Sequence, residues 1–554
     1  MPFNYKSHVY KNLQKDNLLK KLYLYILFGT LGMATTWAQE DRFYIRSIDE
    51  QIEIPVLTKD SVVSYTGDHQ KLKSLFKKYS VKVFRKGFKY AERDKLKRTY
   101  FVIADTPNFQ KALLEEVSDI FEFGESLLPE NLKIYEPNDY GTTSTIGTNQ
   151  GIQANLDYYD FLGVPEAWYY TKGNRDVIVG ISDGYIDPED PEFVGRTTVM
   201  KKSSHSKGHG FAVAATAVGQ GDNGHGITGI CYNCSIYTTT YGDFKFLNQL
   251  LELSKAGAKV INCSWGSTRY YETAQETINE MKDNGTVIVS VPHNPSFQKT
   301  KGKIPRYPGA YEHVVSVGSV QHRFDDPEET LHTNKKGNLY AIGLKNYVGR
   351  AVGFRGNDVK GKQFTYEAST NNLDPYVDIL APGTFIFRYN KYLETGEILY
   401  NQVEKTSPAA PLVTGTIGLM FSINPCLSVD EINSMIKLTA TNIDDIEANA
   451  TFKGMYGAGS LHTGRAVKMS HDMLQPELYT LIENQNFSRW KFTLDAPYKL
   501  KIKNQKFTDS VSVNFTAKNE ILIENETVLL PNENGEISLK IDPEASYNCK
   551  EIKE

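Results

Sequence analysis

Cysteine, excess basic charge and long apolar runs are all scarce in this chain of 554 residues. Its five cysteines are odd in number and widely scattered, which excludes a dense disulfide framework and leaves at least one thiol unpaired. The formal net charge is -4 and no strongly basic stripe is present, so no nucleic-acid partner is expected. With 40% hydrophobic and 23% charged residues, the composition is that of globular domains held together by apolar cores.

One apolar stretch, residues 22–37, lies near the start of the chain. It follows Lys20 and Lys21 and ends in small residues near Ala38, as an export signal does, so we predict a signal peptide over residues 1–38. A membrane anchor is the alternative, but a spanning helix needs about 20 apolar residues, and three charged residues, 40–42, follow directly. The sequence therefore predicts a secreted or cell-surface protein, not an integral membrane protein.

The length of the chain predicts several domains, because one hydrophobic core does not organise this many residues. Residues 39–135 predict a small α+β unit, with a strand over 98–103 and a helix over 108–120. Residues 136–150 are polar and rich in turn formers, which predicts a linker to the next domain.

The central domain, residues 136–474, alternates runs of β-branched residues with helical patterns. The predicted strands are 177–181, 235–239, 260–263, 287–291 and 314–317, and the predicted helices are 210–218, 244–256 and 273–284. Strands that alternate with helices form βαβ units. The predicted fold class is therefore α/β, with a doubly wound, mostly parallel sheet and helices on both faces.

The last segment, residues 475–554, changes to alternating polar and apolar residues, as in 498–504 and 511–515. Asn534 and Gly535 provide a turn signal. We expect a small all-β accessory module of stacked strands.

Hydrolysis by a serine requires a base that takes the hydroxyl proton, a carboxylate that orients the base, and donors for the oxyanion. Asp183 follows a predicted strand directly, at the edge where parallel sheets bind ligands. His209 begins a helix of small side chains, which allows close packing against the sheet. His205 and His225 are the nearby alternatives, but neither begins an apolar helix.

Ser407 is the candidate nucleophile. It precedes Pro408 and an apolar helical stretch, so we expect Ser407 at the N-cap of a helix, near the positive end of the helix dipole. A serine there that acts only as a cap is the alternative.

Eight ordered segments between residues 175 and 470 resemble the motifs of the subtilases, the subtilisin-like serine proteases. They are 181–187 (ISDGYID), 209–215 (HGFAVAA), 223–230 (NGHGITGI), 260–266 (VINCSWG), 291–294 (VPHN), 307–318 (YPGAYEHVVSVG), 377–383 (VDILAPG) and 406–415 (TSPAAPLVTG). Residues 322–372 look like an insertion relative to compact members of the family.

The resemblance implies that Asp183, His209 and Ser407 form the catalytic triad and that Asn294 completes the oxyanion hole. It also implies that Ser264, Trp265 and Gly266 form one wall of the S1 pocket, the subsite for the residue before the cleaved bond, P1. Pro292 and His293 are expected on the opposite wall. Their bulk predicts a narrow pocket that favours small or medium P1 side chains.

The same resemblance implies a prodomain at residues 39–135, which acts as the enzyme's own chaperone and inhibitor and is released by a self-inflicted cut in the linker. The implied function is a secreted serine endopeptidase that acts on proteins or peptides. A pseudoprotease that only binds peptides is the alternative, and an adhesive role for the C-terminal module is a third hypothesis.

Several residues depart from the family motifs: Tyr185, Phe211, His293, Lys405 and Pro408. Pro408 lacks a backbone N–H, but the family's second oxyanion donor is the N–H of the nucleophile itself, which this chain keeps. Retention of all four catalytic positions favours the enzyme over the pseudoprotease.

Cys231 and Cys234 form a CxxC motif, for which a local disulfide, two thiols or half of a metal site are all conceivable. Zinc is disfavoured because no second CxxC exists and His225 alone would leave the ligand set short. No metal or cofactor is predicted, since the structural calcium common in the family has no recognisable ligand cluster here.

Overall fold

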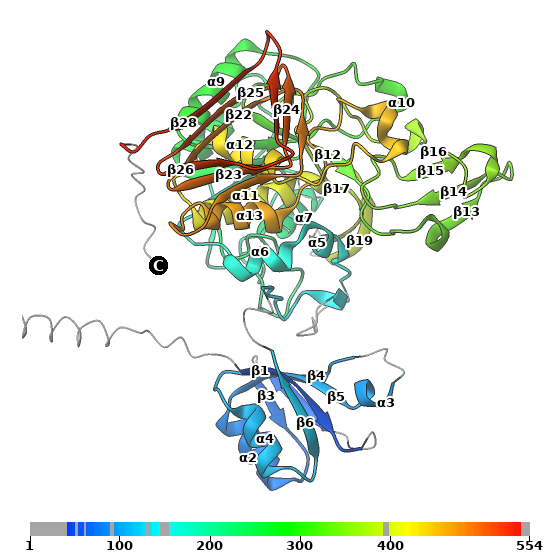
Figure 1. The fold of residues 1–554 in the computed structure, drawn as a ribbon, viewed down its shortest axis with the longest axis vertical. Coiled ribbons are helices and arrows are strands. Elements are labelled where there is room, and N and C mark those ends of the chain that lie inside the picture. The colour runs from blue at the N-terminus through cyan, green and yellow to red at the C-terminus, as the bar shows by residue number, and fades with distance from the viewer. Residues whose placement is uncertain are drawn as a thin grey trace, which may run out of the picture. The chain divides into compact units, whose positions relative to one another are not determined.

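The computed structural model describes residues 41–49, 52, 54–59, 62–88, 93–127, 133–143, 154–205, 207–391 and 398–544. The chain forms two compact units, 1–132 and 133–554 (Figure 1). The predicted signal peptide, 1–38, lies outside the described residues. Within the described ranges, no helix is both long and apolar enough to span a bilayer.

An antiparallel sheet, three helices and a hairpin form the described part of the first unit. Its strands pair in the order β4-β5-β1-β6, with bounds β1 (Asp41–Ser47), β4 (Val81–Lys86), β5 (Thr99–Ala104) and β6 (Phe121–Ser126). The other elements are α2 (Gln70–Lys78), α3 (Asp94–Lys97), α4 (Phe109–Glu116) and a hairpin of β2 (Val56–Lys59) and β3 (Val62–Tyr65). Phe76 of α2 and Phe109 of α4 are buried in a common core with the sheet. The predicted strand and helix are confirmed, but α4 ends early because the chain turns into β6, whose Phe121 N–H donates to Val117 O.

A seven-stranded sheet forms the centre of the second unit, with strand order β17-β12-β11-β10-β7-β9-β8. The strands are β7 (Ile178–Ser182), β8 (Thr197–Val199), β9 (Ser235–Thr239), β10 (Ala258–Cys263), β11 (Val287–Ser290), β12 (Val314–Val320) and β17 (Ile379–Pro382). Every pairing in it is parallel. The five predicted strands are all present, because β-branched residues suit a strand that is covered on both faces.

Helices cover both faces of this sheet, as predicted. Val260 packs in the core that contains α7 (His209–Val218) and α11 (Ala409–Ile423), and the next residue, Ile261, packs in the core that contains α8 (Asn248–Lys255) and α9 (Glu272–Asp283). Successive side chains of a strand point to opposite faces, so one strand serves both cores. The remaining helices of this unit are α5 (Asp157–Leu162), α6 (Val164–Tyr170), α10 (Phe297–Thr300), α12 (Val429–Leu438) and α13 (Thr463–Asp472), with 3₁₀ turns η2 (Gly141–Thr143) and η6 (Glu447–Phe452).

The predicted insertion, 322–372, has a sheet of its own. Strands β13 (Leu331–Thr333), β14 (Leu339–Ile342), β15 (Ala351–Phe354) and β16 (Gln363–Thr365) pair antiparallel in sequence order, with 3₁₀ turns η3 (Pro327–Thr330), η4 (Arg355–Asn357) and η5 (Glu367–Ser369). A separate hairpin of β18 (Thr384–Lys391) and β19 (Ile398–Glu404) leads into α11.

The C-terminal module is a stack of parallel strands. Its nine strands form three parallel sheets, β20-β23-β26, β21-β24-β27 and β22-β25-β28, so each strand pairs with the third strand along the chain. The bounds are β20 (Thr480–Glu483), β21 (Asn486–Phe487), β22 (Lys491–Ala496), β23 (Lys499–Lys503), β24 (Lys506–Asp509), β25 (Ser512–Ala517), β26 (Glu520–Ile523), β27 (Val528–Pro531) and β28 (Glu536–Ile541). Thr493 N–H donates to Ser434 Oγ of α12 at 2.9 Å, which attaches this stack to the helices of the same unit.

The segment just after residue 132 is packed, contrary to the prediction of a linker. Tyr140 is fully buried, with its ring 5.5 Å from that of Trp168. Asp139 is also fully buried and accepts backbone N–H groups from residues 222 and 223. The linker prediction is wrong for this part, because polar residues there bind a distant loop instead of water. The rest of the predicted linker, 144–150, lies outside the described residues.

Candidate functional site

Asp183 follows β7, at the carboxyl edge of the sheet. Its backbone N–H donates to Thr239 O at 3.1 Å, which ties it to the end of β9. Its carboxylate is 1% exposed, and Oδ1 accepts the Gly184 N–H at 2.6 Å. Oδ2 is buried and has no hydrogen-bond partner. A carboxylate so enclosed has a fixed orientation.

His209 is the first residue of α7 and meets that carboxylate. The distance from His209 Nδ1 to Asp183 Oδ1 is 2.7 Å, and the imidazole is 40% exposed. With Nδ1–H donating to the carboxylate, Nε2 of the neutral ring keeps its lone pair. The ring can therefore accept a proton on its exposed side.

Ser407 lies between β19 and α11, with 6% of its surface exposed. The N-cap of α11 is Pro408, in helical conformation, so the prediction that Ser407 is the N-cap is wrong. Thr406 O, not an atom of Ser407, accepts the Ala409 N–H at 2.9 Å. Among the residues described, the Ser407 hydroxyl has no recorded hydrogen bond, including none to His209.

A chain of buried polar groups holds Ser407 in place. Ser264 Oγ donates to Ser407 O at 3.0 Å, and Asn262 Nδ2 donates to Ser264 Oγ at 2.9 Å. Thr414 lies in the second turn of α11, and its Oγ1 donates to Asn262 Oδ1 at 3.1 Å. The sequence analysis missed Asn262 and Thr414 as positioning residues. Asn262 is a polar residue within an otherwise apolar strand. Because buried polar groups need hydrogen-bond partners, this pattern could have identified it.

Asn294 follows β11 and is oriented by the residue before the candidate nucleophile. Its Oδ1 accepts both the Thr406 N–H, at 2.9 Å, and the Thr406 hydroxyl, at 3.0 Å. Both donors fix the oxygen end of the amide, so Nδ2 is the end left to donate elsewhere. His293, just before it, has φ of 77°, a conformation that favours glycine and explains the glycine of the family motif.

The predicted S1 residues follow β10. Trp265 is 7% exposed, its Nε1–H donates to Ser182 O at 2.7 Å, and its ring lies 5.1 Å from that of Phe244. Its indole therefore fixes the end of β7 just before Asp183 and is packed away from solvent. Gly266 precedes a bridge in which the N–H of Ser267 donates to the carbonyl of residue 307 at 2.7 Å.

Two departures from the family motifs have structural explanations. Phe211 is buried between Phe193 and Tyr389, with ring distances of 4.9 and 5.1 Å. The Lys202 ammonium lies over the Tyr185 ring, 5.0 Å from the ring centroid. Both changes add packing around the site and leave the Asp183–His209 contact intact.

Cys231 and Cys234 form a disulfide, the first of the three alternatives for the CxxC motif. Cys426 is disulfide-bonded as well, and Cys263 is a free, buried thiol. In the part of the chain that the structure covers, no group of three His, Cys, Asp or Glu side chains could hold a metal ion.

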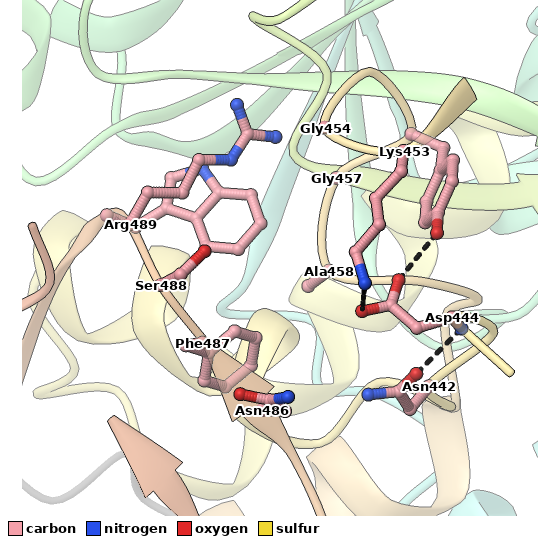
Figure 2. A pocket seen from close by; sticks show the side chains of 12 residues that line it. Asn442, Asp444, Lys453, Gly454, Gly457, Ala458, Asn486, Phe487, Ser488 and Arg489 are labelled. Atoms are coloured by element: carbon pink, nitrogen blue, oxygen red, sulfur yellow. Dashed lines mark hydrogen bonds and ion pairs between the residues drawn. The ribbon is translucent and has the colours of Figure 1, made fainter. Parts of the chain in front are cut away.

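A cavity of about 120 Å³ lies elsewhere, between residues 442–458 and residues 486–490 of the β-stack. Figure 2 shows the Lys453 ammonium beside Asp444, with a distance of 3.5 Å between Nζ and Oδ2. Tyr456 donates its hydroxyl to the same carboxylate. The residues around this cavity include no member of the candidate site. Lys453 and Asp444 are paired with each other, whereas Arg489 donates from Nη1 to Pro375 O at 3.2 Å.

Known proteins with similar sequences indicate the family of this chain. Residues 174–459 match the model of the subtilase family. Subtilisin DY of Bacillus licheniformis is 25% identical over 282 residues, which are 49% of this chain and 85% of that protein. Thermitase of Thermoactinomyces vulgaris is 25% identical over 348 residues, which are 60% of this chain and all of that protein. The crystal structure of fervidolysin from Fervidobacterium pennivorans aligns with a TM-score of 0.42 and 17% identity, covering 78% of this chain and 61% of that one. Because the family model matches just over half of its residues, the chain belongs to the subtilase family and is a serine endopeptidase.

Proposed function

We propose that Ser407 is the nucleophile of this endopeptidase, His209 its general base, Asp183 the carboxylate that orients the base, and Asn294 an oxyanion donor. The observation that carries the proposal is the 2.7 Å contact between His209 Nδ1 and the buried Asp183 Oδ1. A buried, fixed carboxylate holds the imidazole in one tautomer and stabilises the imidazolium that forms during the reaction.

In the first half of the reaction, His209 Nε2 accepts the Ser407 hydroxyl proton while Oγ attacks the substrate carbonyl carbon. The carbonyl oxygen becomes an oxyanion, which Asn294 Nδ2–H and the Ser407 N–H stabilise. His209 then donates its proton to the leaving amine, and the acyl-enzyme remains. Water, deprotonated by His209, then attacks the ester carbonyl carbon. As the bond to Ser407 Oγ breaks, His209 returns the proton to that oxygen, and the new carboxyl end of the substrate is released.

The chain of contacts from Thr414 to Ser407 supports this assignment, since it fixes the backbone on which the attacking oxygen is carried. The orientation of the Asn294 amide supports it as well. Preorganised donors lower the barrier because they do not have to reorient when charge develops.

We further propose that the protein is exported by a signal peptide at residues 1–38 and made as a precursor. Its prodomain would begin at residue 39 and end before Tyr135, a few residues earlier than the predicted boundary at 135. The peptidase domain would follow as far as residue 474, with an accessory module at 475–554. Burial of Tyr140 in the core of the second unit supports a maturation cut on the N-terminal side of Tyr135 rather than within 136–150. Proteins or peptides outside the cell are the proposed substrates.

A fluorophosphonate probe tests the proposed site, because it reacts rapidly only with an activated serine. We expect labelling of Ser407 in the mature enzyme and loss of labelling in His209→Ala. Ser422→Ala, which changes a serine farther along α11, is the matched control and should label like the wild type. Absence of labelling in the wild type would support the pseudoprotease alternative.

A further inference from the structure

A cationic side chain, Arg306, lies beside the predicted S1 wall. A Cβ atom built on Gly266 would lie 3.7 Å from Arg306 Cβ. The two segments are joined at the next residue of each, because Ser267 and Tyr307 exchange backbone hydrogen bonds of 2.7 and 2.8 Å. Arg306 is therefore anchored directly against the segment formed by Ser264, Trp265 and Gly266.

Arg306 also interacts with the opposite predicted wall. Burial lowers the pKa of His293, and the positive charge of Arg306 lowers that pKa further. His293 immediately precedes Asn294, the proposed oxyanion donor. Arg306 thus lies beside both predicted walls of the subsite, with its Cβ next to Gly266 and its charge within electrostatic range of His293.

The Arg306 side chain makes no hydrogen bond and no ion pair among the described residues, and its Nε is buried. Asp374, which interacts with the neighbouring Tyr307, instead accepts the N–H of Tyr376 at 2.9 Å. His293 Nδ1 is likewise buried without a partner. Donors left in this condition are unfavourable unless a ligand or water satisfies them.

An arginine with a purely structural role looks different in this protein. Arg196 is 7% exposed, and its guanidinium donates to the backbone carbonyls of Cys234, Glu192 and Val218. Arg306 is more exposed and lacks any such acceptor. Its guanidinium is therefore available to a group that enters from outside.

From these contacts we propose that Arg306 determines P1 specificity and that the enzyme prefers substrates with an acidic P1 residue, glutamate or aspartate. The proposal rests on the proposed function of Ser407 and on the S1 assignment. A carboxylate at P1 would accept two parallel hydrogen bonds from the guanidinium, the strongest arrangement for this pair. The neutral amide of glutamine or asparagine would accept only one.

The test compares kcat/KM for peptides that differ only at P1, in the pairs Glu and Gln, and Asp and Asn, with mature enzyme obtained from the full chain. We expect wild type to prefer the acid of each pair by about 10- to 100-fold, the range of a charge-assisted hydrogen bond. Arg306→Gln should reduce the preference to within about twofold, with the glutamine peptide as internal control for an intact site. Arg306→Glu should shift the preference to lysine or arginine at P1.

Lys303→Gln is the matched control, because it removes the same charge from an exposed position three residues away. It should keep the wild-type preference. If Lys303→Gln and Arg306→Gln reduced the preference for acidic P1 residues equally, the proposal would be overturned. The overall positive charge of the region, and not a contact with Arg306, would then explain the preference. A wild-type enzyme that labels with fluorophosphonate but cleaves acidic and amide P1 peptides equally would overturn this proposal alone. A wild type whose Ser407 does not label would overturn the proposed function and this inference with it.

Discussion

Gly210 lies so close to Gly184 that a Cβ at position 210 would be only 2.3 Å from the Gly184 carbonyl oxygen. Real side-chain atoms do not approach a backbone oxygen this closely, so α7 must lack a side chain at this point. The contact brings the helix that begins with His209 against the loop that begins with Asp183. Because position 210 carries only a hydrogen atom, the helix can approach closely enough for the 2.7 Å contact between His209 Nδ1 and Asp183 Oδ1.

Replacement of Gly210 by alanine should move α7 away from the Asp183 loop and lengthen that contact. We expect kcat to fall at least about tenfold with little change in KM, because a poorly oriented base impairs chemistry more than binding. Gly285→Ala is the control: its left-handed φ of 76° strains an alanine, yet nothing lies within 4 Å of the added atom. It should lower the melting temperature and leave kcat unchanged. A Gly210→Ala enzyme with wild-type kcat would show that this approach is not required.

Replacement of Asn294 by alanine should remove one oxyanion donor. We expect kcat to fall by about 100- to 1,000-fold with a similar KM, the range established for the equivalent change in subtilisin itself. Asn372→Ala, which removes an amide that donates to Pro292 O at 2.8 Å, tests whether loss of any nearby amide has this effect. A loss below about threefold in Asn294→Ala would mean that another group is the donor.

Ser407→Ala should leave the precursor uncut. The substitution nearly preserves volume, and Pro408, not Ser407, caps α11, so the fold should be retained. Expressed without host proteases, the variant should have the intact mass of prodomain plus enzyme, whereas wild type should give two pieces. The wild-type enzyme should begin on the N-terminal side of Tyr135. Cleavage of the variant at the wild-type position would indicate that a different protease performs maturation.

Asp139 should make stability depend on pH. Burial raises its pKa to about 6, above the ordinary value of 3.8, so the folded state binds the proton more tightly than the unfolded state. Its contribution to stability is therefore greatest below about pH 4 and falls as the pH rises through 6, by roughly 3 kcal/mol in total. Asp139→Asn removes this dependence.

The measurement is chemical unfolding at several pH values, with and without Asp139→Asn, in a Ser407→Ala background that prevents self-digestion. As the pH rises from 4 to 7, the Asp139→Asn variant should become more stable relative to the protein that keeps Asp139. A constant difference would show that Asp139 has the same pKa in both states.

The sequence alone determined the central α/β sheet and the residues of the candidate triad. Strands such as β9 (Ser235–Thr239) were predictable because a run of β-branched residues encodes them locally. Asp183 was predictable because it directly follows such a strand, and His209 because it begins a helix of small residues. These signals depend on neighbours within a few positions along the chain.

Tertiary structure alone decided which polar groups meet. Asp139 is buried because it binds a loop more than 80 residues away, so a segment with the composition of a linker belongs to the core. Ser407 is fixed through Ser264, which is 143 residues away in sequence, and not through the helix that follows it. The C-terminal strands likewise pair with strands three elements along instead of forming hairpins. Hydrogen-bond partners and burial depend on residues that are distant in the chain, which no local pattern encodes.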